Sequence, residues 1–171
     1  GEEGNDYIYA SAGSDIIDGG ANSDLVDYSS SSTGINLTLL DSGATVNVSH
    51  NIGGVASDSL TNIEGIKGSK TASNTLIGNN MNNTLIGGNQ TDIIKGVSGN
   101  NSLSGGAGND TIFAGSGSDT IDGGAGDDWL DYTDLASTNV SVNLRNNTAT
   151  YGSSTDSITA IEHLKMGNGT N

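Results

Sequence analysis

The chain has 171 residues, 27 of them glycine, and contains neither proline nor cysteine. Its 20 Asp and Glu residues outnumber 5 Lys and Arg residues, which gives a formal net charge of −15. The lack of cysteine excludes a disulfide framework and thiolate-bound metal, and the negative charge excludes binding to nucleic acid through its phosphates. No apolar run approaches the roughly 18 residues of a membrane span, and no N-terminal segment has the basic and apolar pattern of a signal peptide.

A nine-residue period begins at the first residue. Residues 1–27 read GEEGNDYIY, ASAGSDIID and GGANSDLVD, so each nonapeptide has an aspartate at its sixth position and an aliphatic residue two positions later. A strand of about three residues with a single inward side chain is not stable by itself. The period therefore predicts short strands that stack into a solenoid around a thin apolar column.

Residues 28–68 interrupt this period. Aliphatic and polar residues alternate over 35–39 and again over 46–48, which predicts half-buried strands. No helical pattern of convincing length is present in this segment or elsewhere. We expect the segment to be a β-rich spacer, built either as wider coils or as a hairpin flap, and not a separate enzyme domain.

The period returns in residues 69–131. The frames of 105–131, which read GGAGNDTIF, AGSGSDTID and GGAGDDWLD, are the most regular. Residues 69–104 are degenerate and carry Asn74, Asn83 and Asn101 in place of the aspartate. Uncharged amides do not repel one another, and stacked asparagines can form a hydrogen-bonded ladder.

Residues 132–171 form a second spacer that matches the first. The segment SDSLTNIEGIKG of the first spacer aligns with TDSITAIEHLKM of the second. The chain thus holds two copies of one larger unit, the second of them truncated. We expect a single continuous solenoid that is a fragment of a longer repetitive protein.

The nonapeptides resemble the RTX (haemolysin-type) calcium-binding repeat, G-G-x-G-x-D-x-U-x. The resemblance covers 1–27 and 69–131 and is most specific at 105–131. It implies an all-β fold, a parallel β-roll or β-solenoid in which two nonapeptides complete one coil. It also implies several calcium ions between neighbouring turns, held by the aspartates and by backbone carbonyls of the glycine-rich turns. Proteins of this family are typically bacterial and leave the cell through type I secretion.

Two nonapeptides per coil would stack residues i and i+18 about 4.8 Å apart. Two carboxylates at that distance repel by about 3 kcal/mol at an effective dielectric constant of ~20. Calcium, which accepts six or more oxygen ligands in flexible geometry, suits such a site better than magnesium, and roughly three to five ions would fit. The candidate metal ligands are Asp6, Asp15, Asp24, Asp92, Asp110, Asp119 and Asp128, with Gly1, Gly4, Gly19, Gly87, Gly105, Gly106, Gly108, Gly117, Gly123, Gly124 and Gly126.

These candidate sites are not equal. We expect the strongest site between the turns of Asp110 and Asp128, followed by the pairs Asp92/Asp110 and Asp6/Asp24. Asp119 faces an asparagine and Asp15 has no stacked partner within its own block, so both are weaker. The segment 69–104 should need little calcium.

Other polar residues have plainer interpretations. The acids at the ninth position, Asp18, Asp27, Asp122 and Asp131, are expected to be surface charges, as is Asp127. His50 and His163 have no acid or nucleophile near them in the sequence, which favours a surface or spacer role. We expect no catalytic residues, since the sequence has no strained G-x-S-x-G turn.

Three classes of function stay open. The first is a calcium-binding structural module of a large secreted or surface-exposed bacterial protein, such as an adhesin, a surface-layer protein or a filament. The second is a glycan- or ice-binding module, and the third is the accessory β-roll of a secreted protease, lipase or polysaccharide-modifying enzyme. We favour the first, which is not an enzyme and folds on calcium outside the cell. Its expected partners are calcium ions, with extracellular glycans or further copies of the chain as additional candidates.

Overall fold

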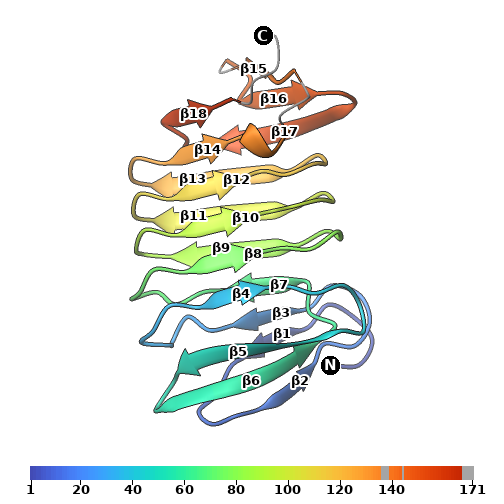
Figure 1. The fold of residues 1–171 in the computed structure, drawn as a ribbon, viewed down its shortest axis with the longest axis vertical. Coiled ribbons are helices and arrows are strands. Elements are labelled where there is room, and N and C mark those ends of the chain that lie inside the picture. The colour runs from blue at the N-terminus through green and yellow to red at the C-terminus, as the bar shows by residue number, and fades with distance from the viewer. Residues whose placement is uncertain (136–138, 144, 167–171) are drawn as a thin grey trace.

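The computed structural model describes residues 1–135, 139–143 and 145–166 and shows a stack of short strands wound into one elongated roll (Figure 1). This part of the chain is almost entirely β-structure, with a single 3₁₀ turn at Thr133–Leu135. The expectation of an all-β solenoid is confirmed. None of the described residues form a helix long and apolar enough to cross a membrane.

One sheet has nine strands and runs along the length of the roll. Its first seven strands are parallel, and the last three, which include the seventh, pair with one another in antiparallel fashion. In spatial order it contains β1 (Tyr7–Tyr9), β3 (Leu25–Asp27), β7 (Gly65–Lys67), β9 (Thr84–Gly88), β11 (Ser102–Ala107), β13 (Thr120–Ala125), β17 (Ser154–Thr159), β16 (Thr148–Tyr151) and β15 (Ser141–Asn143).

The remaining strands form two smaller sheets. The six-stranded sheet is parallel throughout and has the order β18 (His163–Lys165), β14 (Trp129–Asp131), β12 (Thr111–Phe113), β10 (Ile93–Lys95), β8 (Thr75–Ile77) and β4 (Asn36–Thr38). The three-stranded sheet has the order β2 (Ile16–Asp18), β6 (Val55–Thr61) and β5 (Thr45–Asn51).

Pairing within the nonapeptide blocks follows a register of 18 residues. Ile94 lies opposite Ile112 and Leu103 lies opposite Ile121, so two nonapeptides complete one coil. Because parallel strands lie about 4.8 Å apart, this register also stacks the sixth-position residues of alternate turns above one another.

The aliphatic residue two positions after each acid or amide forms the core. These side chains join one apolar cluster that runs from the first block through the second spacer. Each fully buried Leu or Ile contributes roughly 1.5–3 kcal/mol relative to exposure. The fully or nearly fully buried members are Val26, Leu76, Leu85, Ile94, Leu103, Ile112, Ile121 and Leu130.

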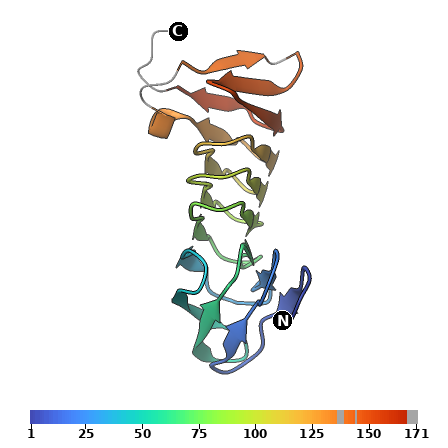
Figure 2. The same ribbon diagram turned by 90° about the vertical axis from the view of Figure 1, so that its right-hand side faces the viewer.

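Each spacer forms an antiparallel hairpin, so the hairpin alternative is the one that the structure shows. Strands β5 and β6 pair along seven residues each, and β6 continues the stack beside β2. Strands β16 and β17 form the second hairpin, and β17 stacks on β13. The hairpins lie toward opposite ends of the narrow stack of nonapeptide coils (Figure 2).

The two hairpins join different sheets. Seven nonapeptide strands, β8 to β14, lie between the spacers. Because the chain changes sheet with every nonapeptide, an odd number of strands puts the second hairpin on the sheet opposite the first. The first hairpin therefore belongs to the three-stranded sheet and the second to the nine-stranded sheet.

Candidate metal centre

Within the blocks, hydrogen bonds link the sixth-position residues of alternate turns along the edges of the roll, and we call these bonds the acid ladder. The backbone N–H of Asp92 donates to Asp110 Oδ1 at 2.7 Å, and that of Asp110 donates to Asp128 Oδ1 at 2.7 Å. On the other edge the N–H of Asp6 donates to Asp24 Oδ1 at 2.8 Å. The expected pairs i and i+18 are therefore in contact, and one carboxylate oxygen of each pair is held by the backbone.

The second oxygen of several ladder aspartates has no partner. Among the described residues, Oδ2 is buried without a hydrogen bond in Asp24, Asp110, Asp119 and Asp128. A buried ionised oxygen without a compensating donor or cation is costly. The ladder thus leaves a row of buried negative oxygens that a cation can satisfy.

The glycines of the turns leave room beside these oxygens. A β-carbon at Gly105 would lie less than 3.0 Å from both Asp110 Oδ2 and the carbonyl oxygen of Gly123. A β-carbon at Gly87 would likewise lie less than 3.0 Å from Asp92 Oδ2 and from the carbonyl oxygen of Gly105. A side chain here would fill the space in which a carboxylate and a carbonyl of the next coil converge. We call this arrangement the glycine cradle.

The same arrangement occurs at the start of the chain. A β-carbon at Gly1 would meet Asp6 Oδ2 and the carbonyl of Gly19. In contrast, the turns of Asp15 and Asp119 begin with Ala10 and Ala114. These two turns carry a β-carbon where the others have a cradle, which agrees with their lower rank in the sequence analysis.

The donor set fits calcium. No three His, Cys, Asp or Glu side chains come together as a metal-binding group in the described part of the chain. Any ion must therefore take many of its ligands from backbone carbonyls. Calcium accepts six to eight oxygens from carboxylates and carbonyls, whereas magnesium retains several of its waters.

Burial perturbs the acidity of the ladder. Removal from water raises the pKa of Asp110 to about 7, and the neighbouring charges of Asp92 and Asp128 add to the shift. Burial raises the pKa of Asp119 to about 6, with a further contribution from Asp156. The metal-free ladder is therefore an unfavourable place for several negative charges, and a bound cation would favour the ionised carboxylates.

The other candidate glycines shape the turns. Gly106 and Gly124 have φ values of 107° and 101°, and a β-carbon on Gly124 would collide with the carbonyl of Gly106. Stacked turns this close require glycine. Positive φ values also occur at the remaining turn candidates, Gly4, Gly108, Gly117 and Gly126, while Gly19 and Gly123 form cradles with Asp24 and Asp128.

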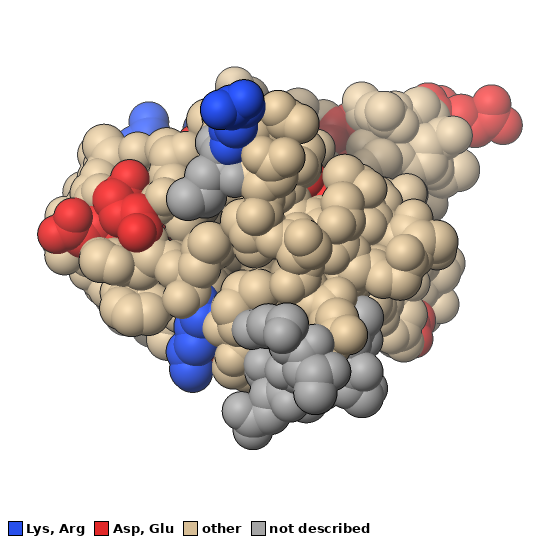
Figure 3. Space-filling view, turned by 90° about the horizontal axis from the view of Figure 1, so that it is seen from above, with Lys and Arg blue, Asp and Glu red and all other residues tan. Residues whose placement is uncertain are grey.

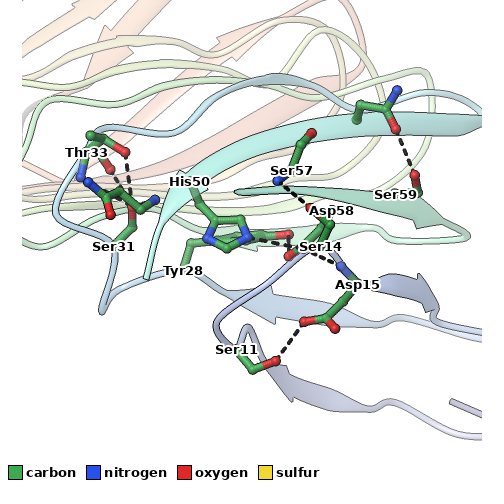
Figure 4. A network of polar contacts seen from close by, with 12 residues as sticks. Ser11, Ser14, Asp15, Tyr28, Ser31, Thr33, His50, Ser57, Asp58 and Ser59 are labelled. Atoms are coloured by element: carbon green, nitrogen blue, oxygen red, sulfur yellow. Dashed lines mark hydrogen bonds and ion pairs between the residues drawn. The ribbon is translucent and has the colours of Figure 1, made fainter. Parts of the chain in front are cut away.

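The ladder continues into the spacers, which the sequence analysis did not foresee. Asp15, which has no stacked partner in its own block, donates its N–H to Asp58 Oδ1 at 2.9 Å. Asp58 also accepts hydrogen bonds from Tyr28 Oη at 2.9 Å and His50 Nε2 at 3.1 Å. Figure 4 shows these side chains directed toward one another between the first block and the hairpin.

Of the two roles expected for His50, surface or spacer, the structure shows a buried residue of the spacer, and the expectation that it has no partner acid was wrong. The hairpin pairs Val48 with Asp58 and His50 with Ala56, which brings the histidine and the acid together inside the fold. Both side chains are completely buried. His163, by comparison, is exposed and stacks on Trp129 with ring centroids 4.7 Å apart.

The second spacer repeats this buried cluster. Asp156 accepts the N–H of Asp119 at 2.9 Å and hydroxyl groups from Tyr132 at 2.8 Å and Tyr151 at 3.1 Å. Asp58 and Asp156 occupy matching positions in the two spacers. Because protein donors reach both of their oxygens, these two acids attach each hairpin to the roll without needing a cation.

Two of the ninth-position acids were also wrongly assigned to the surface. Asp27 and Asp131 are each 3% exposed. Asp27 pairs with Lys67 at 3.2 Å and Asp131 pairs with Lys165 at 2.9 Å. In each spacer the lysine returns beside the acid because its strand stacks on the last strand of the block. Asp18, Asp122 and Asp127 are exposed, as expected.

Burial of the ladder also changes the visible surface. Seen from the end nearest the second spacer, most of the molecule presents uncharged residues, and acidic side chains form small separate groups (Figure 3). Much of the negative charge lies inside the turns, since Asp24, Asp92, Asp110, Asp119 and Asp128 are all buried.

Comparison with known families agrees with this geometry. The model of the RTX calcium-binding nonapeptide repeat matches in four copies, over residues 1–29, 71–103 and 95–130. The chain belongs to the RTX calcium-binding nonapeptide repeat family. Its blocks are therefore calcium-binding RTX repeats. The hairpins of the two spacers lie outside the matched ranges. No curated protein matches the chain.

Proposed function

We propose that this RTX β-roll is a calcium-dependent structural module of a large secreted or surface-exposed bacterial protein of adhesin, surface-layer or filament type. The observation that carries the proposal is the set of buried carboxylate oxygens without partners at Asp24, Asp110, Asp119 and Asp128. A fold that depends on a cation at these positions acts as a rod only where that cation is abundant. The proposed role is mechanical and does not involve catalysis.

The ladder residues would bind the ions between coils. Asp92 and Asp110 present Oδ2 beside the carbonyls of Gly105 and Gly123, while their Oδ1 atoms stay bound to backbone N–H groups. Asp92 Oδ2 also accepts the N–H of Gly88 at 2.6 Å, whereas Asp110 Oδ2 has no partner. Calcium, when bound, would supply the positive charge that Asp110 Oδ2 lacks. Because only the folded chain brings the oxygens together, binding would stabilise the fold by mass action.

This coupling suits a protein that is exported before it folds. Where calcium is scarce, the raised pKa values of Asp110 and Asp119 show that burial disfavours their charged forms. At millimolar calcium outside the cell, ion binding would offset that cost. The continuous apolar cluster would then join both RTX blocks and both spacers in one rod, and this supports a spacer-like role.

A calcium titration tests the proposal. Trp129 follows Asp128 directly and is partly exposed, so its fluorescence should report order at the regular end of the array. We expect calcium to increase far-ultraviolet β-signal and change Trp129 emission, and a chelator to reverse both. If both signals ignore calcium and chelator, calcium-coupled folding is wrong for this chain.

A glycan-binding role is the second candidate. Tyr7 and Tyr9 are 49% and 76% exposed, and their rings lie 5.0 Å apart on the first strand. Exposed aromatic rings can stack on sugar rings. Binding to a glycan array that is lost in the double variant Tyr7→Ala and Tyr9→Ala would support this role, and an array without signal would remove it.

A further inference from the structure

The two junctions between an RTX block and its spacer share an arrangement that neither region has alone. Asp24 and Asp128 are the last ladder aspartates of their blocks, so no nonapeptide follows to supply the next carboxylate. The N–H of Asp24 instead donates to Glu64 Oε2 at 3.1 Å, and that of Asp128 donates to Glu162 Oε2 at 2.9 Å. A spacer glutamate thus takes the ladder position that an aspartate holds elsewhere.

The spacer also supplies the carbonyl of a glycine cradle. A β-carbon on Gly123 would lie less than 3.0 Å from Asp128 Oδ2 and from the carbonyl oxygen of Ala160. At the first junction, a β-carbon on Gly19 would lie less than 3.0 Å from Asp24 Oδ2 and from the carbonyl oxygen of Asn62. At Gly87 and Gly105, within the array, the corresponding carbonyl comes from Gly105 and Gly123 of the next coil.

The backbone of the spacer is held in an unusual conformation to present these carbonyls. Asn62 and Ala160 have φ values of 53° and 48°, in the left-handed region that residues with a β-carbon seldom adopt. Each is followed two residues later by the glutamate. In each spacer, three residues thus contain both the carbonyl and the carboxylate that face the junction. In a nonapeptide, the carbonyl of the first residue and the carboxylate of the sixth are separated by the whole turn.

The oxygen that faces this arrangement has no partner at either junction. Asp24 Oδ2 and Asp128 Oδ2 are buried without a hydrogen bond, in side chains that are 1% and 0% exposed. Asp58 and Asp156 differ, because each receives donors on both oxygens. At each junction the spacer therefore contributes an aspartate bound by protein donors and a glutamate that accepts the N–H of an aspartate whose Oδ2 is unpartnered.

We propose that each junction is a calcium site completed by the spacer. The first site comprises Asp24, Glu64 and the carbonyl of Asn62, and the second comprises Asp128, Glu162 and the carbonyl of Ala160. We call them the junction sites. The proposal rests on the calcium binding proposed above and extends it beyond the nonapeptides. The spacer is thus attached to the array by metal as well as by its buried aspartate.

The variants Glu64→Gln and Glu162→Gln test the junction sites. Glutamine keeps an oxygen that can accept the backbone hydrogen bond but removes the charge, and circular dichroism in calcium would verify the fold. Asp122→Asn is the matched control, because it removes one exposed charge near the second junction. The number of bound ions would be counted by native mass spectrometry at calcium concentrations that just saturate the wild-type chain.

We expect each glutamine variant to carry one ion fewer than the wild type, with affinity for that ion about tenfold weaker because ligand charge sets calcium affinity. Terbium offers a second readout, since Trp129 lies beside Asp128 and can sensitise an ion bound there. Its emission should fall in Glu162→Gln and persist in Glu64→Gln and Asp122→Asn.

An unchanged ion count in either glutamine variant overturns the site at that junction, even when the wild type binds calcium elsewhere. Loss of an ion in Asp122→Asn as well would show an effect of charge alone and also overturn the assignment. A wild-type chain that binds no calcium would instead refute the proposed function, so the two failures can be told apart.

Discussion

The two parts of the central array, 69–104 and 105–131, share one coil geometry but close their turns differently. In the regular part, Asp110 and Asp128 each keep one buried oxygen without a partner. In the degenerate part, the Nδ2 group of Asn101 donates to the carbonyls of Ser98 and Gly99 at 3.2 and 3.1 Å. The amide nitrogen thus binds turn carbonyls that have no such side-chain donor in an aspartate turn.

Asn74 shows the same principle more completely. Its Oδ1 accepts the N–H groups of Ile35 and Ser69 at 3.0 and 2.8 Å. Its Nδ2 donates to the carbonyl of Ser69 and to Asp92 Oδ1. The turn of Asn74 is therefore satisfied by protein atoms alone, whereas Asp110 and Asp128 each leave one buried oxygen that a cation can satisfy. The comparison suggests that a single atom, oxygen or nitrogen, changes the need of such a turn for a cation.

The double variant Asp110→Asn and Asp128→Asn should have the largest effect. It removes the charges of the strongest expected sites and leaves turns that resemble those of 69–104. Each site occupied at 100 times its dissociation constant contributes about 2.7 kcal/mol, so the calcium-dependent stability should fall by roughly 5 kcal/mol for two sites. Chemical denaturation with and without calcium measures the change, with Asp122→Asn as control. An unchanged calcium increment would contradict the ladder model.

The reverse substitution, Asn101→Asp, should create calcium dependence. It removes the donor to Ser98 and Gly99 and buries a carboxylate, which we expect to cost about 1–3 kcal/mol without calcium. Gly96 already provides the cradle glycine for this turn, with the carbonyl of Ala114 beside it. Thermal unfolding should show a lowered transition that calcium partly restores. Equal loss in calcium and chelator would mean that the turn cannot bind an ion.

The buried spacer clusters should respond without regard to calcium. Tyr28→Phe removes the hydroxyl that donates to Asp58 Oδ2 and should destabilise the fold by about 1.5–3 kcal/mol, because the lost bond is to a charged group. The loss should be the same in calcium and in chelator, as measured by denaturant unfolding. A loss that appears only with calcium would place Asp58 among the ligands.

The smallest expected effect is that of pH on the metal-free fold. An unfolded aspartate has a pKa near 4, whereas burial raises that of Asp110 to about 7 and that of Asp119 to about 6. The folded chain therefore holds protons that the unfolded chain releases between pH 4 and pH 7. In chelator, stability should rise from pH 7 to pH 6 by roughly 1 kcal/mol through Asp110 and by a smaller amount through Asp119, whose pKa is lower.

The calcium-loaded fold should show the opposite slope, because protons compete with the ion for the same carboxylates. Unfolding midpoints measured in matched buffers at pH 7 and pH 6 would compare the two forms. If stability in chelator fell with decreasing pH, as we expect in calcium, the ionised buried carboxylates would not be the groups that destabilise the metal-free fold.

The nonapeptide blocks were predictable because one residue type recurs at one spacing. The period placed each ladder aspartate above its partner, and it ranked Asp15 and Asp119 lower because Asp15 has no stacked aspartate in its block and Asp119 faces Asn101. The expected ladder of asparagine side chains takes another form, because the backbone N–H of Asn83 donates to Asn101 Oδ1. It does not run from amide to amide.

The spacer residues could not be placed by the same reasoning, because each hairpin changes the distance along the chain between stacked positions. Asp15 meets Asp58 and Asp24 meets Glu64 at separations that no fixed period predicts. A signal was nevertheless present, since the two matching spacer segments share an aspartate and a glutamate six residues apart. His50 required the hairpin register, which depends on a turn at Gly53 and Gly54.

Amide hydrogen exchange in calcium and in chelator tests the central claim most directly. The strands of 105–131 and those of 75–95 share the 18-residue register with their nonapeptide neighbours and the same buried aliphatic column, and they differ in their turn chemistry. We predict that calcium removal increases exchange strongly in β12, β13 and β14 and much less in β8 and β9. Equal changes in the two segments, or none in either, would contradict the account.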